Sequence, residues 1–188
     1  MHGDRALTGA GLPMWGRVAL FLGVVVVLGW FTNIEPGRRA IAGPVTRASV
    51  HATGFLINAF GGEARTEGTM IYGSRGALDV KDGCNGVIAM ILFVGAVAAH
   101  AAPTGLKILG LVIGIPLIAV VNLIRLVTLY AVAVVAPARL EFFHVFFWQT
   151  LIIIFVALLW YFWADWCLSR EIRHRSARSP AGSGVATG

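Results

Sequence analysis

The sequence predicts an all-α membrane protein with about four transmembrane helices, an interfacial amphipathic helix and a small extracytoplasmic β-hairpin. The composition carries most of this prediction, because hydrophobic residues make up 57% of the 188-residue chain and charged residues only 13%. A soluble domain typically carries about 25% charged residues, so this chain, with a mean hydropathy of +0.79, cannot cover a water-exposed surface. Its apolar runs approach the roughly 20 residues that cross a bilayer. Disordered proteins, coiled coils and nucleic-acid-binding proteins are excluded.

The first expected span runs from Val18 to Ile34 and carries no charge. Arg5 and Arg17 precede it, which predicts a cytoplasmic N-terminus by the positive-inside rule. The alternative is a cleaved signal peptide, because residues 40–42 (Ala-Ile-Ala) resemble an A-x-A cleavage site. A proline and two arginines separate that site from the apolar run, so the sequence favours a retained span.

Residues Val45–Phe60 predict an amphipathic helix. Apolar side chains recur at helical spacing on one expected face, at Val45, Ala48, Ala52, Phe55, Leu56 and Ala59. Polar side chains occupy the opposite face, at Thr46, Arg47, Ser49 and Thr53. Such a helix is expected to lie in the outer interface rather than to span, because a crossing would place the two ends of the chain on opposite sides.

The polar stretch between residues 61 and 83 predicts a hairpin on the outer face. Thr69–Tyr72 and Ala77–Lys81 have the character of short strands, and a glycine-bounded turn at residues 73–76 joins them. Strands that flank such a turn are a hairpin signal. This hairpin leads directly into the next expected span.

Three further spans are expected, at Val87–Ala101, from Leu106 past Asn122, and at Val145–Trp163. The short loop at 102–105 makes the first two antiparallel neighbours. The sequence leaves open whether the third span ends near Arg125 or continues to Val135. Residues 1–168 thus form one membrane-embedded domain. Residues 169–188 are expected to be a basic, disordered cytoplasmic tail, because arginines follow an aromatic belt there.

Cys84 is the first candidate functional residue. It follows a turn and immediately precedes an expected transmembrane helix at the outer surface. The N-terminal end of a helix carries a partial positive charge that stabilises a thiolate, so this thiol is a candidate nucleophile. The alternative is a small interfacial residue that only packs.

Arg125 and His144 are its candidate partners. Arg125 lies within an apolar run, where ionisable groups are costly and often functional, and Asn122 shares its helical face. His144 opens the last span, and Glu141, three residues earlier, is placed to accept the imidazole N–H. The alternatives are a snorkelling arginine and an interfacial histidine. Together with Cys84 at the same outer level, the arginine and histidine predict an acyl-transfer site.

Other reactive residue types are not expected to contribute. Cys167 lies at the inner face, which forbids a disulfide with Cys84 within one chain, and His100 is expected to pack. No cofactor and no metal site are expected, because no cysteines or carboxylates converge on the remaining histidines, His2, His51 and His174.

Three motifs give the chain a resemblance to the exosortase/archaeosortase family of membrane-embedded, sortase-like cysteine transpeptidases, and within it to exosortase H. They are Asp-Gly-Cys-Asn-Gly-Val at 82–87, Asn-Leu-Ile-Arg at 122–125, and Glu-Phe-Phe-His-Val-Phe-Phe-Trp-Gln at 141–149. Their order and their positions at the outer ends of spans also agree. The resemblance covers residues 62–163.

The resemblance implies a catalytic set of Cys84, Arg125 and His144, with Asn85, Asn122 and Glu141 as supporting residues. It implies cleavage of a C-terminal sorting signal at the outer face of a bacterial inner membrane. Substrates would be membrane-anchored secreted proteins with a short motif of the Ile-Pro-Thr-Leu type, a transmembrane helix and a basic cluster. A non-catalytic membrane scaffold or a small transporter subunit, whose polar residues only join helices, is the alternative.

Overall fold

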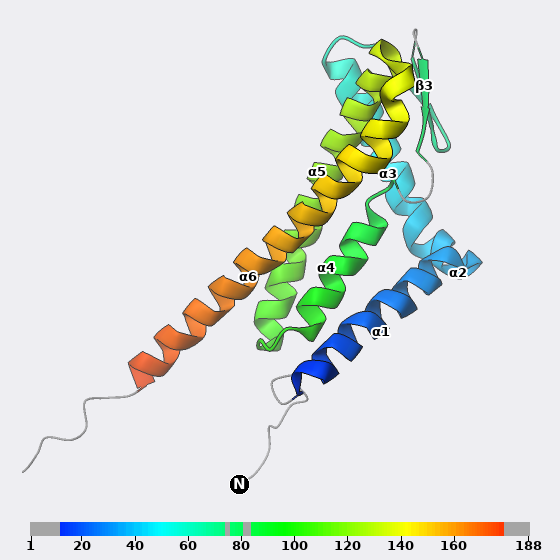
Figure 1. Ribbon diagram of the computed structural model, residues 1–188. Coiled ribbons are helices and arrows are strands. Elements are labelled where there is room, and N and C mark those ends of the chain that lie inside the picture. Colours follow the sequence, from blue (N-terminus) through cyan, green and yellow to red (C-terminus); the bar gives the residue numbers. More distant parts are fainter. Residues whose placement is uncertain (1–11, 74–75, 81–83, 179–188) are drawn as a thin grey trace, which may run out of the picture.

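The computed structural model describes residues 12–73, 76–80 and 84–178, with side chains as far as residue 173. Its central feature is a bundle of α1 (Met14–Asn33), α4 (Val87–Ala99), α5 (Thr104–Val135) and α6 (Trp148–Arg178) (Figure 1). The strands lie at one end, here named the sheet end, and Cys84 lines a cavity there together with residues of β3. The start of α1, the loop after α4 and the last turns of α6 lie at the opposite end. The predicted class, an all-α membrane protein with a small hairpin, is confirmed.

Three helical segments are long and apolar enough to cross a membrane, at Met14–Asn33, Thr104–Val135 and Pro137–Arg173. The fourth predicted span corresponds to α4, which has 13 residues and is therefore about 20 Å long, shorter than the roughly 30 Å hydrocarbon core. Helix α5 continues without a break past Arg125 to Val135. The longer of the two alternatives for the third span is therefore correct.

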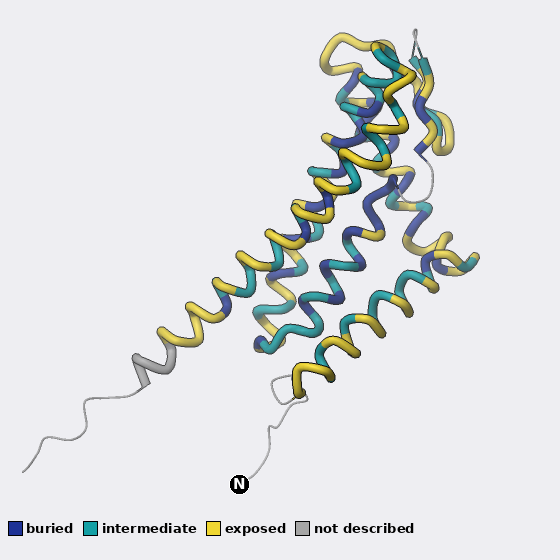
Figure 2. Tube along the Cα trace, in the orientation of Figure 1, coloured by how far each residue is buried: buried dark blue, intermediate teal, exposed yellow. Residues whose placement is uncertain are grey.

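Helix α4 is the buried centre of the bundle (Figure 2). Phe93 and Val97 on α4 pack with Ile118 of α5 and Val156 of α6. Helix α1 covers another side of α4 at Gly95, where a Cβ would lie only 3.1 Å from a valine of α1. Small residues let membrane helices approach this closely. The outer faces of α1, α5 and α6 expose many large hydrophobic side chains, as lipid contact requires.

The segment after α1 folds into a short turn, α2 (Glu35–Gly37), a π-helical turn at Arg38–Ala42, and α3 (Gly43–Ala59). The predicted amphipathic helix is present, and the face that carries Thr46 and Thr53 packs against the rest of the protein. Thr46 and Thr53 are buried, whereas Phe55 is 72% exposed.

The threonines can be buried because their hydroxyls are satisfied within the helix. The hydroxyl of Thr46 donates to the carbonyl of Ala42 (2.8 Å), and that of Thr53 to Ser49 (2.7 Å). A threonine bonded in this way leaves no unsatisfied donor, and its oxygen can still accept a further hydrogen bond. In a lipid environment the most apolar face of a helix need not be the one that packs against protein.

The predicted hairpin is confirmed as β2 (Met70–Gly73) and β3 (Gly76–Asp79), while the turn residues 74–75 and the predicted strand end at Lys81 lie outside the described residues. A third strand, β1 (Arg65–Glu67), extends it to an antiparallel sheet in the order β1-β2-β3. The sequence analysis missed β1. The sequence signal for this strand is Gly68. It adopts a φ of +59° in the tight turn between β1 and β2.

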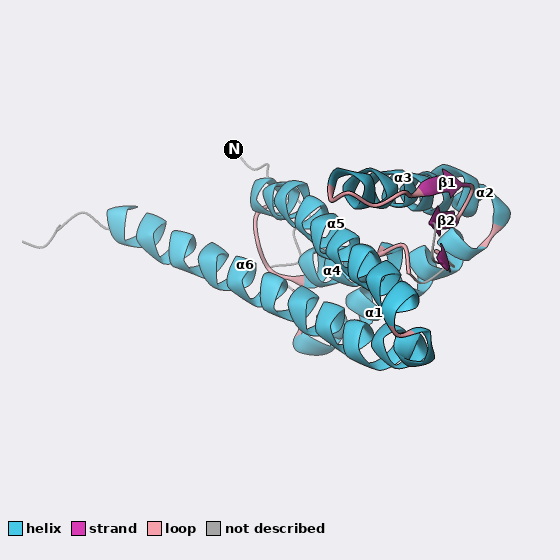
Figure 3. Ribbon diagram, turned by 90° about the horizontal axis from the view of Figure 1, so that it is seen from above, coloured by secondary structure: helices cyan, strands magenta, loops and turns pink. Residues whose placement is uncertain are grey.

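The last helix is longer than the sequence predicted. A 3₁₀ turn at Pro137–Arg139 and a π-helical segment at Phe142–Phe147 lead into α6, which continues to Arg178. The prediction of a disordered tail from residue 169 is therefore wrong for residues 169–178. Arginine and glutamate favour helices, and the guanidinium of Arg170 lies 4.4 Å from the ring centroid of Trp166. Viewed from above, α6 extends well beyond the bundle (Figure 3).

Candidate active site

The structure brings Cys84, Arg125 and His144 together at the sheet end. Cys84 lies in the loop that leads into α4, Arg125 on α5, and His144 in the π-helical segment before α6. The Sγ atom of Cys84 contacts Nε2 of His144. Nη2 of Arg125 donates to the same sulfur at 3.9 Å. Residues separated by as many as 60 positions thus form one cluster, as the sequence analysis expected.

Arg125 approaches the sulfur from the interior of the bundle. Its residue exposure is 2%, and its Nε atom has no hydrogen-bond partner among the described residues. A buried cation is unstable unless an opposite charge or several acceptors compensate it. A Cys84 thiolate would supply that charge.

Asn85 fastens the loop that carries the cysteine to α3. Its Nδ2 donates to Thr46 Oγ1 (3.0 Å), and its Oδ1 accepts the backbone N–H of Val87 (3.1 Å). The sequence analysis proposed Asn85 as a supporting residue but missed Thr46. Thr46 is only one of several polar residues of this amphipathic helix, and nothing in the sequence distinguishes it as a partner of Asn85.

Gly86 and Asn122 lie against each other beneath the same loop. Gly86 has a φ of +77°, and a Cβ at this position would lie 2.9 Å from Asn122 Cγ. Glycine is required here for two reasons. Other residues rarely adopt a positive φ, and a Cβ would be too close to Asn122. Asn122 is 1% exposed, on the same face of α5 as Arg125. It therefore supports the irregular backbone from below.

Glu141 does not hold the imidazole as the sequence analysis expected. Its side chain lies at the exposed rim of the site, and among the described residues no hydrogen bond joins it to His144. The local helix explains the difference. Phe142–Phe147 is a π-helix, whose wider turn removes the alignment that residues three apart have on an α-helix.

A cavity of about 430 Å³ opens beside the cluster. Cys84 and His144 line it together with three residues of β3, Glu141, and apolar side chains from α5 and from the connection to α6. Ligand pockets typically enclose about 300–1,000 Å³. A thiol with an adjacent imidazole and a fixed cation, open to such a cavity, is suited to nucleophilic attack on a carbonyl.

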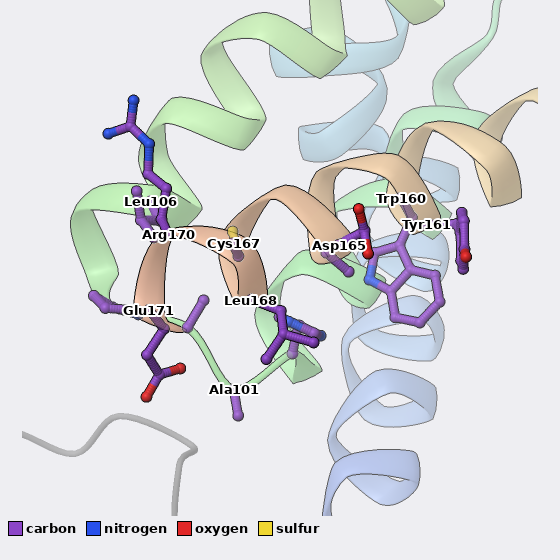
Figure 4. A pocket seen from close by; sticks show the side chains of 13 residues that line it. Ala101, Leu106, Trp160, Tyr161, Asp165, Cys167, Leu168, Arg170 and Glu171 are labelled. Atoms are coloured by element: carbon purple, nitrogen blue, oxygen red, sulfur yellow. The ribbon is translucent and has the colours of Figure 1, made fainter. Parts of the chain in front are cut away.

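A second cavity, of about 600 Å³, lies at the opposite end, where Cys167 points its sulfur toward the bundle (Figure 4). His100 also lines it and makes edge-on ring contacts with Trp160 and Trp163, at centroid distances of 6.0 and 5.3 Å. This is the packing role that the sequence predicts for His100. No disulfide joins Cys84 and Cys167.

Of the histidines outside these two ends, His51 is the one whose side chain the structure describes. His51 Nδ1 lies 3.0 Å from Thr66 Oγ1, His2 lies outside the described residues, and the side chain of His174 is not described. In the described part of the chain, no three histidine, cysteine or carboxylate side chains are grouped as they would be around a metal ion.

One comparison with known proteins identifies a similar family. The family model described as transmembrane exosortase (Exosortase_EpsH) matches residues 6–163, which is more than half of the chain and includes all the site residues above. No curated protein and no solved structure matches the chain.

Proposed function

Because the chain belongs to the transmembrane exosortase family, we propose that it is a membrane-embedded cysteine peptidase and transpeptidase. It cleaves the C-terminal sorting signal of secreted proteins at the outer face of a bacterial inner membrane and transfers them to an acceptor. The resemblance to exosortase H suggests signals of the Ile-Pro-Thr-Leu type. Both ends of the chain lie in the cytoplasm, and the sheet end faces outward.

One observation carries this proposal: the sulfur of Cys84 contacts both the imidazole of His144 and the guanidinium of Arg125 beside an open cavity. A cysteine that only packs would need neither partner. A snorkelling arginine would extend its guanidinium to water, whereas Arg125 is fully buried.

In the first half-reaction, His144 Nε2 takes the proton of the Cys84 thiol, and the thiolate attacks the carbonyl carbon of the scissile peptide bond. A C–S bond forms, and the carbonyl oxygen becomes an oxyanion. Arg125 stabilises the thiolate before attack and then the oxyanion, which lies two bonds from the sulfur, an effect typically worth several kcal/mol. The C–N bond then breaks, and His144 returns its proton to the leaving amine.

In the second half-reaction, an amine or hydroxyl of the acceptor attacks the thioester. His144 accepts the proton of the acceptor, the new C–N or C–O bond forms, and the C–S bond breaks to restore the cysteine. Water in place of the acceptor would give hydrolysis by the same steps.

The test is a secreted reporter that ends in an Ile-Pro-Thr-Leu-type motif, a transmembrane helix and a basic cluster, co-expressed with the full chain. The wild type should shorten the reporter, and Cys84→Ala should abolish shortening while it still inserts into the membrane. Cys167→Ala is the matched control and should process normally. Processing by Cys84→Ala at the wild-type rate would refute the proposal and favour a scaffold or transporter subunit.

A further inference from the structure

Strand β3 forms one edge of the sheet, and it lies beside the reactive cysteine. In the order β1-β2-β3 it pairs with β2 alone, and it packs at the end of α5 (Figure 1). Ala77, Leu78 and Asp79 all line the cavity that contains Cys84 and His144. Because consecutive side chains of a strand point to opposite faces, contact with three residues in a row is the pattern expected of a cavity that runs along the edge of the strand.

The register shows which backbone groups face that edge. The N–H of Val80 donates to the carbonyl of Thr69 (2.9 Å), and these two residues are directly opposite in the β2–β3 register. Hydrogen-bonded and non-hydrogen-bonded pairs alternate along an antiparallel ladder. Ala77 and Asp79 therefore belong to non-hydrogen-bonded pairs, and their N–H and C=O groups point away from β2.

That edge is available in the described structure. Ala77 and Asp79 are both exposed, and among the described residues no backbone hydrogen bond reaches either of them from another element. The Asp79 side chain is held by the hydroxyl of Thr69, which donates to Oδ1 at 2.9 Å. An edge strand with outward N–H and C=O groups is a template for a further strand.

We propose that the substrate binds in extended form as a fourth strand of this sheet, with its main chain paired to Ala77 and Asp79 and its scissile carbonyl at Cys84. The proposal rests on the peptidase function above and specifies the conformation in which the substrate is read. A strand added to the edge lies about 4.8 Å from β3, within the cavity whose other wall carries His144.

This mode of binding determines which substrate side chains matter. Main-chain pairing is indifferent to sequence, and alternate side chains supply the specificity. One set faces an apolar wall formed by Leu126, Leu129 and Leu140, and the carboxylates of Asp79 and Glu141 also line the cavity. The site therefore accepts an apolar residue on the inner side of the strand and disfavours acidic residues near the cleaved bond.

The protein-side test uses Ala77→Pro with Ala77→Ser as the matched control. Proline removes the outward N–H and is tolerated on an edge strand, whereas serine keeps the N–H. With purified full-length chain and a synthetic peptide that spans the cleavage segment of the reporter, Ala77→Pro should raise KM about tenfold, as expected for one lost hydrogen bond. Ala77→Ser keeps this hydrogen bond and should therefore have a KM about tenfold below that of Ala77→Pro, and both variants should alkylate Cys84 at the wild-type rate.

The substrate-side test leaves the enzyme unchanged. Peptides that carry a single N-methyl group at successive positions should lose cleavage at every second position, because only alternate N–H groups face the edge. Equal KM for the proline and serine variants, or the absence of alternation, would overturn the fourth-strand proposal while Cys84-dependent cleavage stands. If the wild type and Cys84→Ala leave the peptide equally intact, the peptidase function itself fails, and this inference fails with it.

Discussion

The two ends of the bundle contain similar residue types in very different arrangements. Each end has a cysteine, a histidine and a cavity of a few hundred cubic ångströms. At the sheet end the sulfur contacts an imidazole and a guanidinium. At the opposite end no described hydrogen bond links Cys167 to His100, whose ring is held by Trp160 and Trp163.

The backbone accounts for much of the difference. Cys84 lies on irregular backbone next to Gly86, where the chain can present the sulfur to two other segments. Cys167 lies within the regular α6, with its sulfur fixed by the helix. Irregular backbone at membrane depth is tolerated only where protein buries it or a cavity adjoins it. Such a loop is thus a better functional signal than the presence of cysteine and histidine together.

The largest expected effect is the difference in reporter processing between variants of the two histidines. His144→Ala removes the group that moves the proton, so reporter processing should fall about 10²–10⁴-fold. His100→Ala, the matched control at the opposite end, should leave the rate within twofold. Both rates are measured on the reporter at equal expression. A comparable loss in both variants would mean that His144 acts through folding rather than through chemistry.

A smaller effect, on the rate of Cys84 alkylation, is expected when the cationic side chains are replaced. Arg125→Gln removes the positive charge next to Cys84 Sγ, so alkylation of Cys84 by iodoacetamide at pH 7 should slow about 10–100-fold. The control is Lys107→Gln, because Lys107 Nζ donates to the Ala98 carbonyl (2.7 Å) far from the cysteine. Mass spectrometry of the labelled peptide measures both. Unchanged alkylation in Arg125→Gln would leave the arginine with a purely structural role.

Replacing a glycine by alanine should change the stability of the protein differently at the two ends. Gly86→Ala forces a Cβ against Asn122 at a positive φ and should destabilise the chain by about 1–2 kcal/mol. Gly105→Ala, in the first turn of α5, meets nothing within 4 Å and should be neutral or stabilising by up to about 1 kcal/mol. Thermal unfolding in detergent compares them. Equal stability of the two variants would argue against a strained loop at Gly86.

The sequence predicted the secondary-structure elements and the grouping of Cys84, Arg125 and His144 more accurately than it predicted the contacts of other side chains. Apolar runs and polar turns are local signals, so the helices and the β2–β3 hairpin could be predicted. The convergence of Cys84, Arg125 and His144 followed from topology, since antiparallel spans bring the three residues to the same level of the bundle. The sequence did not show which face of α3 packs, because the burial of Thr46 and Thr53 depends on contacts with distant segments. The predicted hydrogen bond between Glu141 and the imidazole failed for a local reason, because the π-helix at Phe142–Phe147 has no clear sequence signal.

The smallest effect concerns pH at the opposite end. Burial, followed by the charges of Arg17 and Lys107, lowers the pKa of His100. In the unfolded chain His100 has an ordinary pKa of about 6.5, so the unfolded chain binds more protons than the folded one in mildly acidic solution. The stability that neutral His100 contributes is therefore complete above pH 6.5. It decreases as the pH falls toward the lower pKa of the folded state. Between pH 7.5 and 5, the apparent Tm of the wild type should drop by up to about 2 °C more than that of His100→Phe. Equal drops, measured by tryptophan fluorescence, would show that the imidazole at the opposite end is as easily protonated as one in water, and that the two ends differ less in electrostatics than their geometry indicates.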